Sequence, residues 1–166
     1  MSVVVSDTSP IRSLAHLGLL PLLSELYDAV VIPPAVFNEL TREGKLFTPL
    51  TRADLAMLCL REPVLEIAQT TAFLELDAGE REAIRLAIEL SADGLLIDEN
   101  SGRRVAKMYG LRVTGTLGIL GQAKQRGFIE SVGPLIDRLQ TEINFFISPA
   151  LRREVLTDLG EWPSDK

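Results

Sequence analysis

Short runs of β-branched residues alternate with longer stretches in which apolar residues recur at helical spacing. The expected strands are 3–5, 29–32 and 94–98, with short strands at 111–113 and 145–147 and either a short strand or an extended piece at 64–68. The expected helices are two short ones within 9–26, followed by 33–44, 77–90, 102–109, 116–126, 131–143 and 149–159. This alternation is typical of βαβ units and predicts a three-layer α/β/α sandwich with a mostly parallel central sheet.

The pattern is less regular between residues 45 and 62, where Thr51-Arg52-Ala53-Asp54 indicates a helix start. The chain has 166 residues, a length typical of a single domain, so we expect one domain over 1–166. Residues 131–160 are expected to form a C-terminal helical extension of that domain.

Composition narrows the chemistry. The chain is 46% hydrophobic and 24% charged, which predicts a folded protein. Its one cysteine, Cys59, and one histidine, His16, exclude an intrachain disulfide and a Cys/His zinc site. His16 lies in a leucine-rich helix and is expected at its surface. Because no apolar stretch is long enough to cross a bilayer and the N-terminus lacks a basic segment, we expect a cytoplasmic protein without a membrane segment.

Acidic residues stand at the ends of the predicted strands. Asp7 follows the strand 3–5 and Asp98 ends the strand 94–98, so neighbouring strands would bring both carboxylates to the functional edge of a parallel sheet. Glu39 and Glu80 lie in helices beside these strands and could join them. Carboxylates without histidine or cysteine are ligands for Mg²⁺ or Mn²⁺, ions that activate water in phosphodiester hydrolysis. Ser9 could orient the Asp7 carboxylate or a metal-bound water.

Each acid also has a structural interpretation. Asp7 could interact with the dipole of the following helix, and Asp98 could cap one. Glu80 could complete a capping box that begins at Asp77, and Glu39 could lie on a solvated helix face. The residue types alone leave both interpretations open.

The formal net charge of −6 is unusual for a protein that binds RNA unaided, but two divalent cations would bring it to −2. Arg103, Arg104 and Lys107 follow Asp98 on one predicted helix, where Arg103 and Lys107 share a face. They could contact RNA phosphates. Alternatively, they pair with Glu99 or solvate the helix.

Four segments and their order resemble the PIN-domain family, in particular a PIN-like branch of prokaryotic proteins. They are Ser6-Asp7-Thr8-Ser9-Pro10-Ile11, 32–40, 76–84 and Leu95-Leu96-Ile97-Asp98-Glu99, followed by Gly102-Arg103-Arg104 and Gly115-Thr116-Leu117-Gly118. The resemblance covers residues 1–120. It implies an α/β/α fold and a ribonuclease that depends on Mg²⁺ or Mn²⁺.

Matched to the family's motifs, the catalytic and metal-binding acids are Asp7, Glu39, Glu80 and Asp98. The resemblance also implies an RNA substrate. Many relatives are toxins of toxin–antitoxin pairs, restrained by a small antitoxin protein and often dimeric, so a homodimer is expected.

The chain departs from the family at three places: Glu80 replaces the more common aspartate, Leu96 replaces a threonine or serine, and Ser101-Gly102 replaces an Asp-Phe pair. An alternative is therefore a non-catalytic PIN-like module that binds nucleic acid or protein. A haloacid-dehalogenase-like phosphatase is set aside, because it requires an aspartate at the position of Ser9. A receiver domain requires an acidic pair where Asp7 stands alone.

Overall fold

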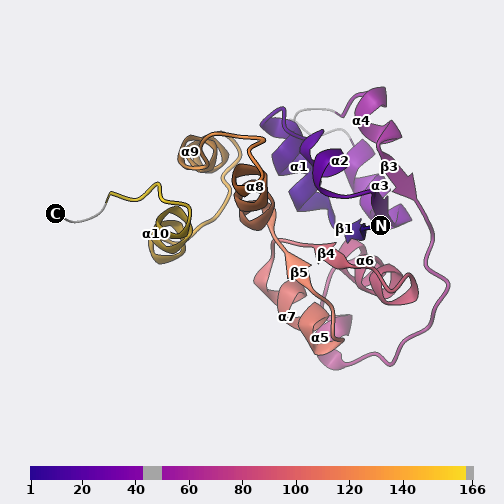
Figure 1. Cartoon of the computed structure of the whole chain (residues 1–166). Coiled ribbons are helices and arrows are strands. Elements are labelled where there is room, and N and C mark those ends of the chain that lie inside the picture. Colours follow the sequence, from indigo (N-terminus) through magenta and orange to yellow (C-terminus); the bar gives the residue numbers. More distant parts are fainter. Residues whose placement is uncertain (43–49, 164–166) are drawn as a thin grey trace. The chain divides into compact units, whose positions relative to one another are not determined.

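The computed structural model describes residues 1–42 and 50–163, which form two compact units that divide between Thr116 and Leu117 (Figure 1). The strands are β1 (Val3–Ser6), β2 (Ala29–Ile32), β3 (Leu58–Leu60), β4 (Gly94–Leu96) and β5 (Val113–Thr114). They form one parallel sheet in the order β3-β2-β1-β4-β5. The order changes direction at β1, which lies between β2 and β4.

The helices of the described residues agree closely with the predicted ranges. They are α1 (Thr8–His16), α2 (Leu22–Leu26), α3 (Pro34–Thr41), α4 (Arg52–Ala56), α5 (Thr71–Leu74), α6 (Ala78–Glu89), α7 (Asn100–Met108), α8 (Thr116–Gln125), α9 (Gly133–Glu142) and α10 (Pro149–Asp158). The predicted end of α3 near Gly44 lies outside the described residues. None of these helices is both long and apolar enough to cross a membrane.

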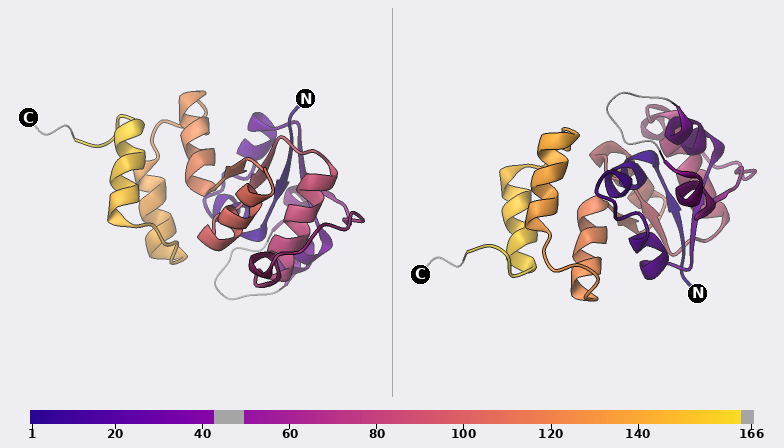
Figure 2. Two further views of the ribbon diagram at one scale, coloured as in Figure 1. Left: turned by 90° about the horizontal axis from the view of Figure 1, so that it is seen from below. Right: turned by 90° about the horizontal axis from the view of Figure 1, so that it is seen from above.

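Both faces of the sheet are covered. Side chains alternate between the faces of a strand, so Val5, Val31 and Leu95 lie on one face, where helices α5, α6 and α7 pack over them. Val4 and Leu96 point the other way and are equally buried. Figure 2 shows α1 and α2 on the opposite side of the sheet from α6 and α7. The predicted α/β/α sandwich with a parallel sheet is confirmed.

One predicted strand is wrong, and one strand was missed. The third strand is Leu58–Leu60, in the stretch judged irregular, and its three residues are too few to show an alternating pattern. Residues 64–68 form no strand, because side chains bind their backbone: the Glu89 carboxylate accepts hydrogen bonds from the amides of Val64 and Leu65. The short helix α5 was also missed.

The predicted strand at 145–147 is wrong. Asn144 has a positive φ of 55°, which turns the chain sharply after α9. The amide of Phe145 donates to the carbonyl of Leu139 and so completes the helix end, in place of a sheet partner. The apolar run 145–147 therefore follows the C-terminal end of α9, where its first amide satisfies a helix carbonyl, and it does not form a strand.

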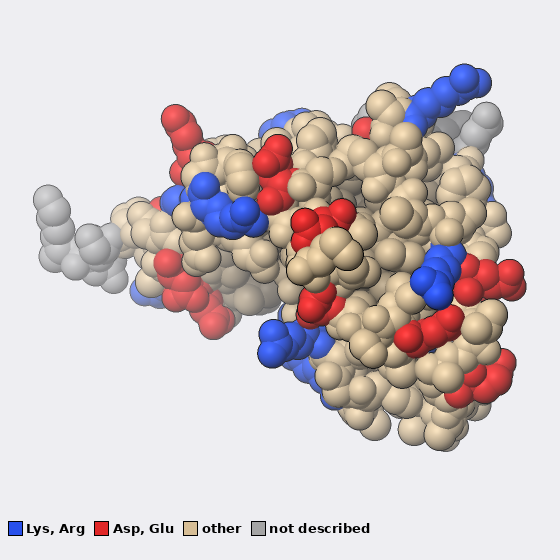
Figure 3. All heavy atoms as spheres, turned by 45° about the vertical axis from the view of Figure 1, so that its right-hand side comes forward, with Lys and Arg blue, Asp and Glu red and all other residues tan. Residues whose placement is uncertain are grey.

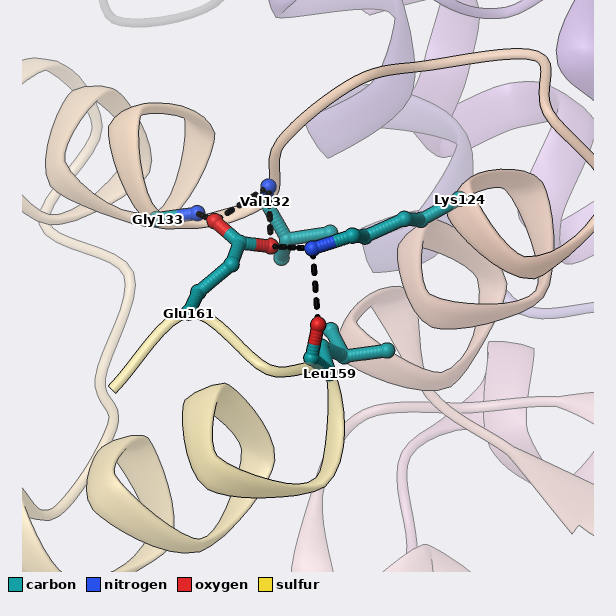
Figure 4. Close-up of polar contacts among 5 residues, drawn as sticks. All are labelled: Lys124, Val132, Gly133, Leu159 and Glu161. Atoms are coloured by element: carbon teal, nitrogen blue, oxygen red, sulfur yellow. Dashed lines mark hydrogen bonds and ion pairs between the residues drawn. The ribbon is translucent and has the colours of Figure 1, made fainter. Parts of the chain in front are cut away.

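The second unit has a partly buried polar connection centred on Glu161 (Figure 4). Its carboxylate accepts hydrogen bonds from the amides of Val132 and Gly133 at the start of α9, and it forms a 2.9 Å ion pair with Lys124 of α8. Lys124 also donates to the carbonyl of Leu159. Although burial acts to raise the pKa of Glu161, the bonds from Gly133, Lys124 and Val132 hold it below its ordinary value. One carboxylate therefore joins the three helices of this unit.

We expect Glu161→Ala to lower the free energy of unfolding by roughly 2–3 kcal/mol, because it leaves two amides without an acceptor and removes the ion pair of Lys124. The matched control is Asp137→Asn, which removes the exposed ion pair with Arg152 and should cost less than about 1 kcal/mol. Urea unfolding at pH 7 measures both. Equal losses in the two variants would contradict the assignment.

Candidate carboxylate site

The site begins where the sheet changes direction. Strands β1 and β4 are neighbours, with Ser6 aligned to Leu96, and the amide of Asp7 donates to the carbonyl of Leu96 at 2.9 Å. Asp7 and Asp98 therefore leave adjacent strands at the same edge, as the sequence predicted if the strands were neighbours. In open parallel sheets, ligands bind at such a point.

Asp7 is buried, with 7% of its surface exposed. It occupies the N-cap position of α1, but its side chain forms no capping hydrogen bond. Burial raises the pKa of Asp7 to about 7, opposed by a hydrogen bond from the Thr8 backbone and reinforced by the negative charges of Asp77, Glu80 and Glu39. Keeping this carboxylate in a buried acidic cluster destabilises its charged form, which is typical of a functional site.

Glu39 meets Asp7 above the first turn of α6. A Cβ atom added to Gly79 would lie 3.2 Å from the Oδ1 atom of Asp7, 3.2 Å from the Oε1 atom of Glu39 and 3.5 Å from the Oδ1 atom of Asp77. The absence of a side chain at Gly79 allows three carboxylates to approach one another here. Glu39 thus belongs to the cluster and is not on a separate solvated face.

Glu80 both caps α6 and lies in the carboxylate cluster, two roles that the sequence analysis gave as alternatives. It completes the predicted capping box of α6: its amide donates to Asp77 Oδ1 at 2.8 Å, and its Oε2 atom accepts from the Asp77 amide at 3.2 Å. Its other oxygen, Oε1, is buried without a hydrogen-bond partner among the described residues. Burial, then the negative charges of Asp77, Glu99 and Glu39, raise the pKa of Glu80 to about 7.

Asp98 is held by neutral donors. Its Oδ2 atom accepts hydrogen bonds from the Ser9 hydroxyl at 2.9 Å and the Thr116 hydroxyl at 2.8 Å, and its Oδ1 atom accepts from the Thr116 amide at 2.6 Å. The N-cap of α7 is Glu99, so Asp98 does not cap that helix. Ser9, predicted to orient Asp7, instead orients Asp98.

The three predicted phosphate contacts lie in different environments. Arg103 is half-buried and donates from Nη1 to the carbonyl of Ile97 at 3.2 Å, whereas Arg104 and Lys107 are exposed. None of the three forms an ion pair with Glu99 among the described residues. On the face in Figure 3, acidic and basic side chains are interspersed, without a broad basic surface.

The carboxylate oxygens of this site are of the chemical type that binds a divalent cation. Carboxylate oxygens are the ligands that Mg²⁺ and Mn²⁺ prefer, and the buried Oε1 atom of Glu80 lacks any other partner. However, no three acidic, histidine or cysteine side chains of the described residues stand at ligand distances around one point. The carboxylates would therefore have to move closer together to bind an ion.

Asp77, which the sequence offers only as a weaker candidate near the site, lies in this cluster. Its charge raises the pKa of both Asp7 and Glu80 while its side chain caps α6. The capping box was visible in the pattern Asp77-Ala78-Gly79-Glu80, but a cap is normally only a helix start. The signal that it faces other acids was Gly79, whose lack of a side chain matters only in the folded structure.

A parallel sheet with acids at its direction change defines a class of α/β proteins, and the comparisons give the family. A solved structure, a PilT N-terminus domain protein SSO1118 from the hyperthermophilic archaeon Sulfolobus solfataricus P2, is 19% identical with a TM-score of 0.52. The match covers 74% of this chain and 92% of that one, and it shows a shared fold. A family model described as a PIN domain matches residues 3–161. The chain therefore belongs to the PIN-domain family, as its motifs suggested.

PIN domains are generally metal-dependent nucleases. A comparison with curated proteins gives no match.

Proposed function

We propose that this protein is an endoribonuclease that depends on Mg²⁺ or Mn²⁺. The observation that carries the proposal is the cluster of the buried Asp7 and Glu80 with the partly buried Glu39, in which two pKa values are raised to about 7 and one carboxylate oxygen has no partner among the described residues. Natural proteins rarely keep such repulsion in a fold without a use for it, because it lowers stability.

In this proposal Asp7, Glu39 and Glu80 bind the ion directly, and Asp98 completes the set. A bound divalent cation supplies a hydroxide-like water at neutral pH and stabilises the charge of the leaving oxygen. Other residues of the protein orient these carboxylates. The backbone amide of Asp77 holds one oxygen of Glu80, and the hydroxyls of Ser9 and Thr116 hold Asp98. Hydrolysis adds water across one P–O bond, and the departing ribose oxygen takes up a proton.

The test is cleavage of an RNA that contains structured and single-stranded parts, with the full chain in Mg²⁺, Mn²⁺ or EDTA. Cleavage that needs the ion supports the nuclease. Binding of Mn²⁺ is measured separately by calorimetry, because a folded protein that neither binds Mn²⁺ nor cleaves RNA would contradict the proposal.

Metal binding at this site should depend on the absence of a side chain at Gly102. A Cβ atom there would lie 2.5 Å from Ile97 Cδ1 and 2.7 Å from Glu80 Oε1, so Gly102→Ala must displace the unpartnered oxygen. We expect roughly tenfold weaker Mn²⁺ binding, equivalent to about 1.4 kcal/mol. The control is Gly94→Ala, where the nearest atoms are at 3.7 Å and no ligand is near. Equal Mn²⁺ affinity in both variants would contradict the role of Glu80.

The family resemblance supports a more specific role, the toxin of a toxin–antitoxin pair. We infer a small antitoxin protein as partner and a homodimer as the active form. Expression of the chain should then arrest bacterial growth, and coexpression of a neighbouring small protein should restore it. Light scattering of the purified protein measures the oligomeric state.

One observation favours a second function, a non-catalytic PIN-like module that binds nucleic acid or protein. No preassembled group of three metal ligands is present among the described residues. This alternative predicts RNA or protein binding that is unchanged by EDTA, together with no cleavage under any metal condition.

A further inference from the structure

The guanidinium of Arg103 lies at the edge of the carboxylate site. Arg103 lies in the first turn of α7, and its side chain folds back so that Nη1 donates to the carbonyl of Ile97. Ile97 immediately precedes Asp98. The guanidinium is thus placed at the end of the strand that carries a proposed metal ligand.

Gly115 makes room for this arrangement. A Cβ atom at Gly115 would lie 2.8 Å from Nη1 of Arg103 and 2.9 Å from Oδ1 of Asp98. The guanidinium and the carboxylate therefore approach the same point, which any larger residue would fill. A side chain on Gly115 would push one of the two groups away.

Despite this proximity, Arg103 is not neutralised. Among the described residues no carboxylate forms an ion pair with it, and its Nε and Nη2 atoms donate to no protein acceptor. Asp98 is instead satisfied by Ser9 and Thr116. Most of the donors of a half-buried cation therefore remain available beside the acids.

A guanidinium with two or more free donors matches the oxygens of a phosphate, which it can bind in a bidentate manner. We propose that Arg103 binds the phosphodiester that is cleaved and stabilises its charge during hydrolysis. This inference rests on the proposed function. Water forms the new P–O bond, the leaving ribose oxygen takes the proton, and Arg103 only holds the phosphate oxygens. The exposed Arg104 and Lys107 would contact RNA outside the reacting group.

The experiment compares Arg103→Gln and Arg103→Lys with the control Arg112→Gln, which removes an exposed arginine that precedes β5 at the other end of the sheet. Affinity for a short single-stranded RNA is measured by fluorescence anisotropy in the Asp7→Asn background, so that cleavage does not interfere. Cleavage kinetics are measured with Asp7 intact, and melting temperatures are measured for all variants.

We expect Arg103→Gln to weaken RNA affinity roughly tenfold and to lower kcat by about 100-fold, because the lost contact strengthens as charge develops. Arg103→Lys should recover most of the affinity but little of kcat, since an ammonium lacks the planar fork. Arg112→Gln should leave both within about twofold.

The outcomes separate this inference from the nuclease itself. Cleavage that is unchanged by Arg103→Gln overturns the inference and leaves the nuclease standing. Absence of cleavage in the wild type, with RNA affinity still dependent on Arg103, overturns the nuclease and retains phosphate binding by Arg103. Equal loss of affinity in Arg103→Gln and Arg112→Gln indicates general charge and overturns the inference. If Arg103→Gln unfolds, the kcat of folded Arg103→Lys decides.

Discussion

Asp7→Asn should lower metal-dependent RNA cleavage by about 100-fold or more while leaving the protein at least as stable as the wild type. Asparagine keeps the size of the side chain but cannot provide a charged ligand. It also removes a buried negative charge that lies close to Glu39, Glu80 and Asp77. Loss of activity together with a gain in stability is expected of a residue kept for chemistry.

The control for Asp7→Asn is Asp158→Asn, at the exposed end of α10. It makes the same chemical change at an exposed position outside the carboxylate site, and both activity and melting temperature should be unchanged. The measurements are initial rates in Mn²⁺ and thermal unfolding at pH 8. Retained cleavage in Asp7→Asn would remove Asp7 from the site, and a large fall in its melting temperature would indicate a structural role.

Metal binding should depend steeply on pH. Because the pKa values of Asp7 and Glu80 are raised to about 7, both carboxyls are largely protonated at pH 6 in the metal-free protein. A cation must displace those protons, so the affinity for Mn²⁺ should rise by up to about 100-fold per pH unit below 7 and level off above pH 8. Calorimetry in buffers of different ionisation enthalpy counts the protons released, which should approach two at low pH.

The same pKa shifts fix the sign of the stability change without metal. Between about pH 4 and 7 the folded protein holds protons on Asp7 and Glu80 that the unfolded chain has released. The free energy of unfolding therefore falls as pH rises through this range, by an amount on the order of a few kcal/mol. Mn²⁺ should restore stability above pH 7, and Asp7→Asn should flatten the profile. A profile without slope in the wild type would contradict the raised pKa values.

The sheet was predictable where its strands are buried on both faces. Val3-Val4-Val5 and Ala29-Val30-Val31-Ile32 are continuous apolar runs, which are typical of central parallel strands, and they became β1 and β2. The edge strand β3 was not predictable because three residues, one of them an exposed cysteine, give no period. The conformation of residues 64–68 was also hard to predict from the local sequence, because the amides of Val64 and Leu65 bind Glu89, which is distant in sequence.

Prediction of the carboxylate site from the sequence was limited for a different reason. The positions of Asp7 and Asp98 at strand ends followed from sequence, but their adjacency required the strand order, which local patterns do not contain. Glu39 was indistinguishable from a solvated helix residue until the family motif was considered. For Glu80, the capping box and the site were treated as alternatives, although the two oxygens of one carboxylate serve both.

The capping box of α6 has a consequence for how the proposed site would choose its ion. One oxygen of Glu80 is already bound to the Asp77 backbone, so the side chain has little rotational freedom left to lose when the other oxygen becomes a ligand. A ligand fixed in this way costs little entropy to recruit, but it adapts poorly to a larger coordination shell. It favours Mg²⁺ and Mn²⁺ over Ca²⁺, which needs longer bonds and more numerous, flexible ligands.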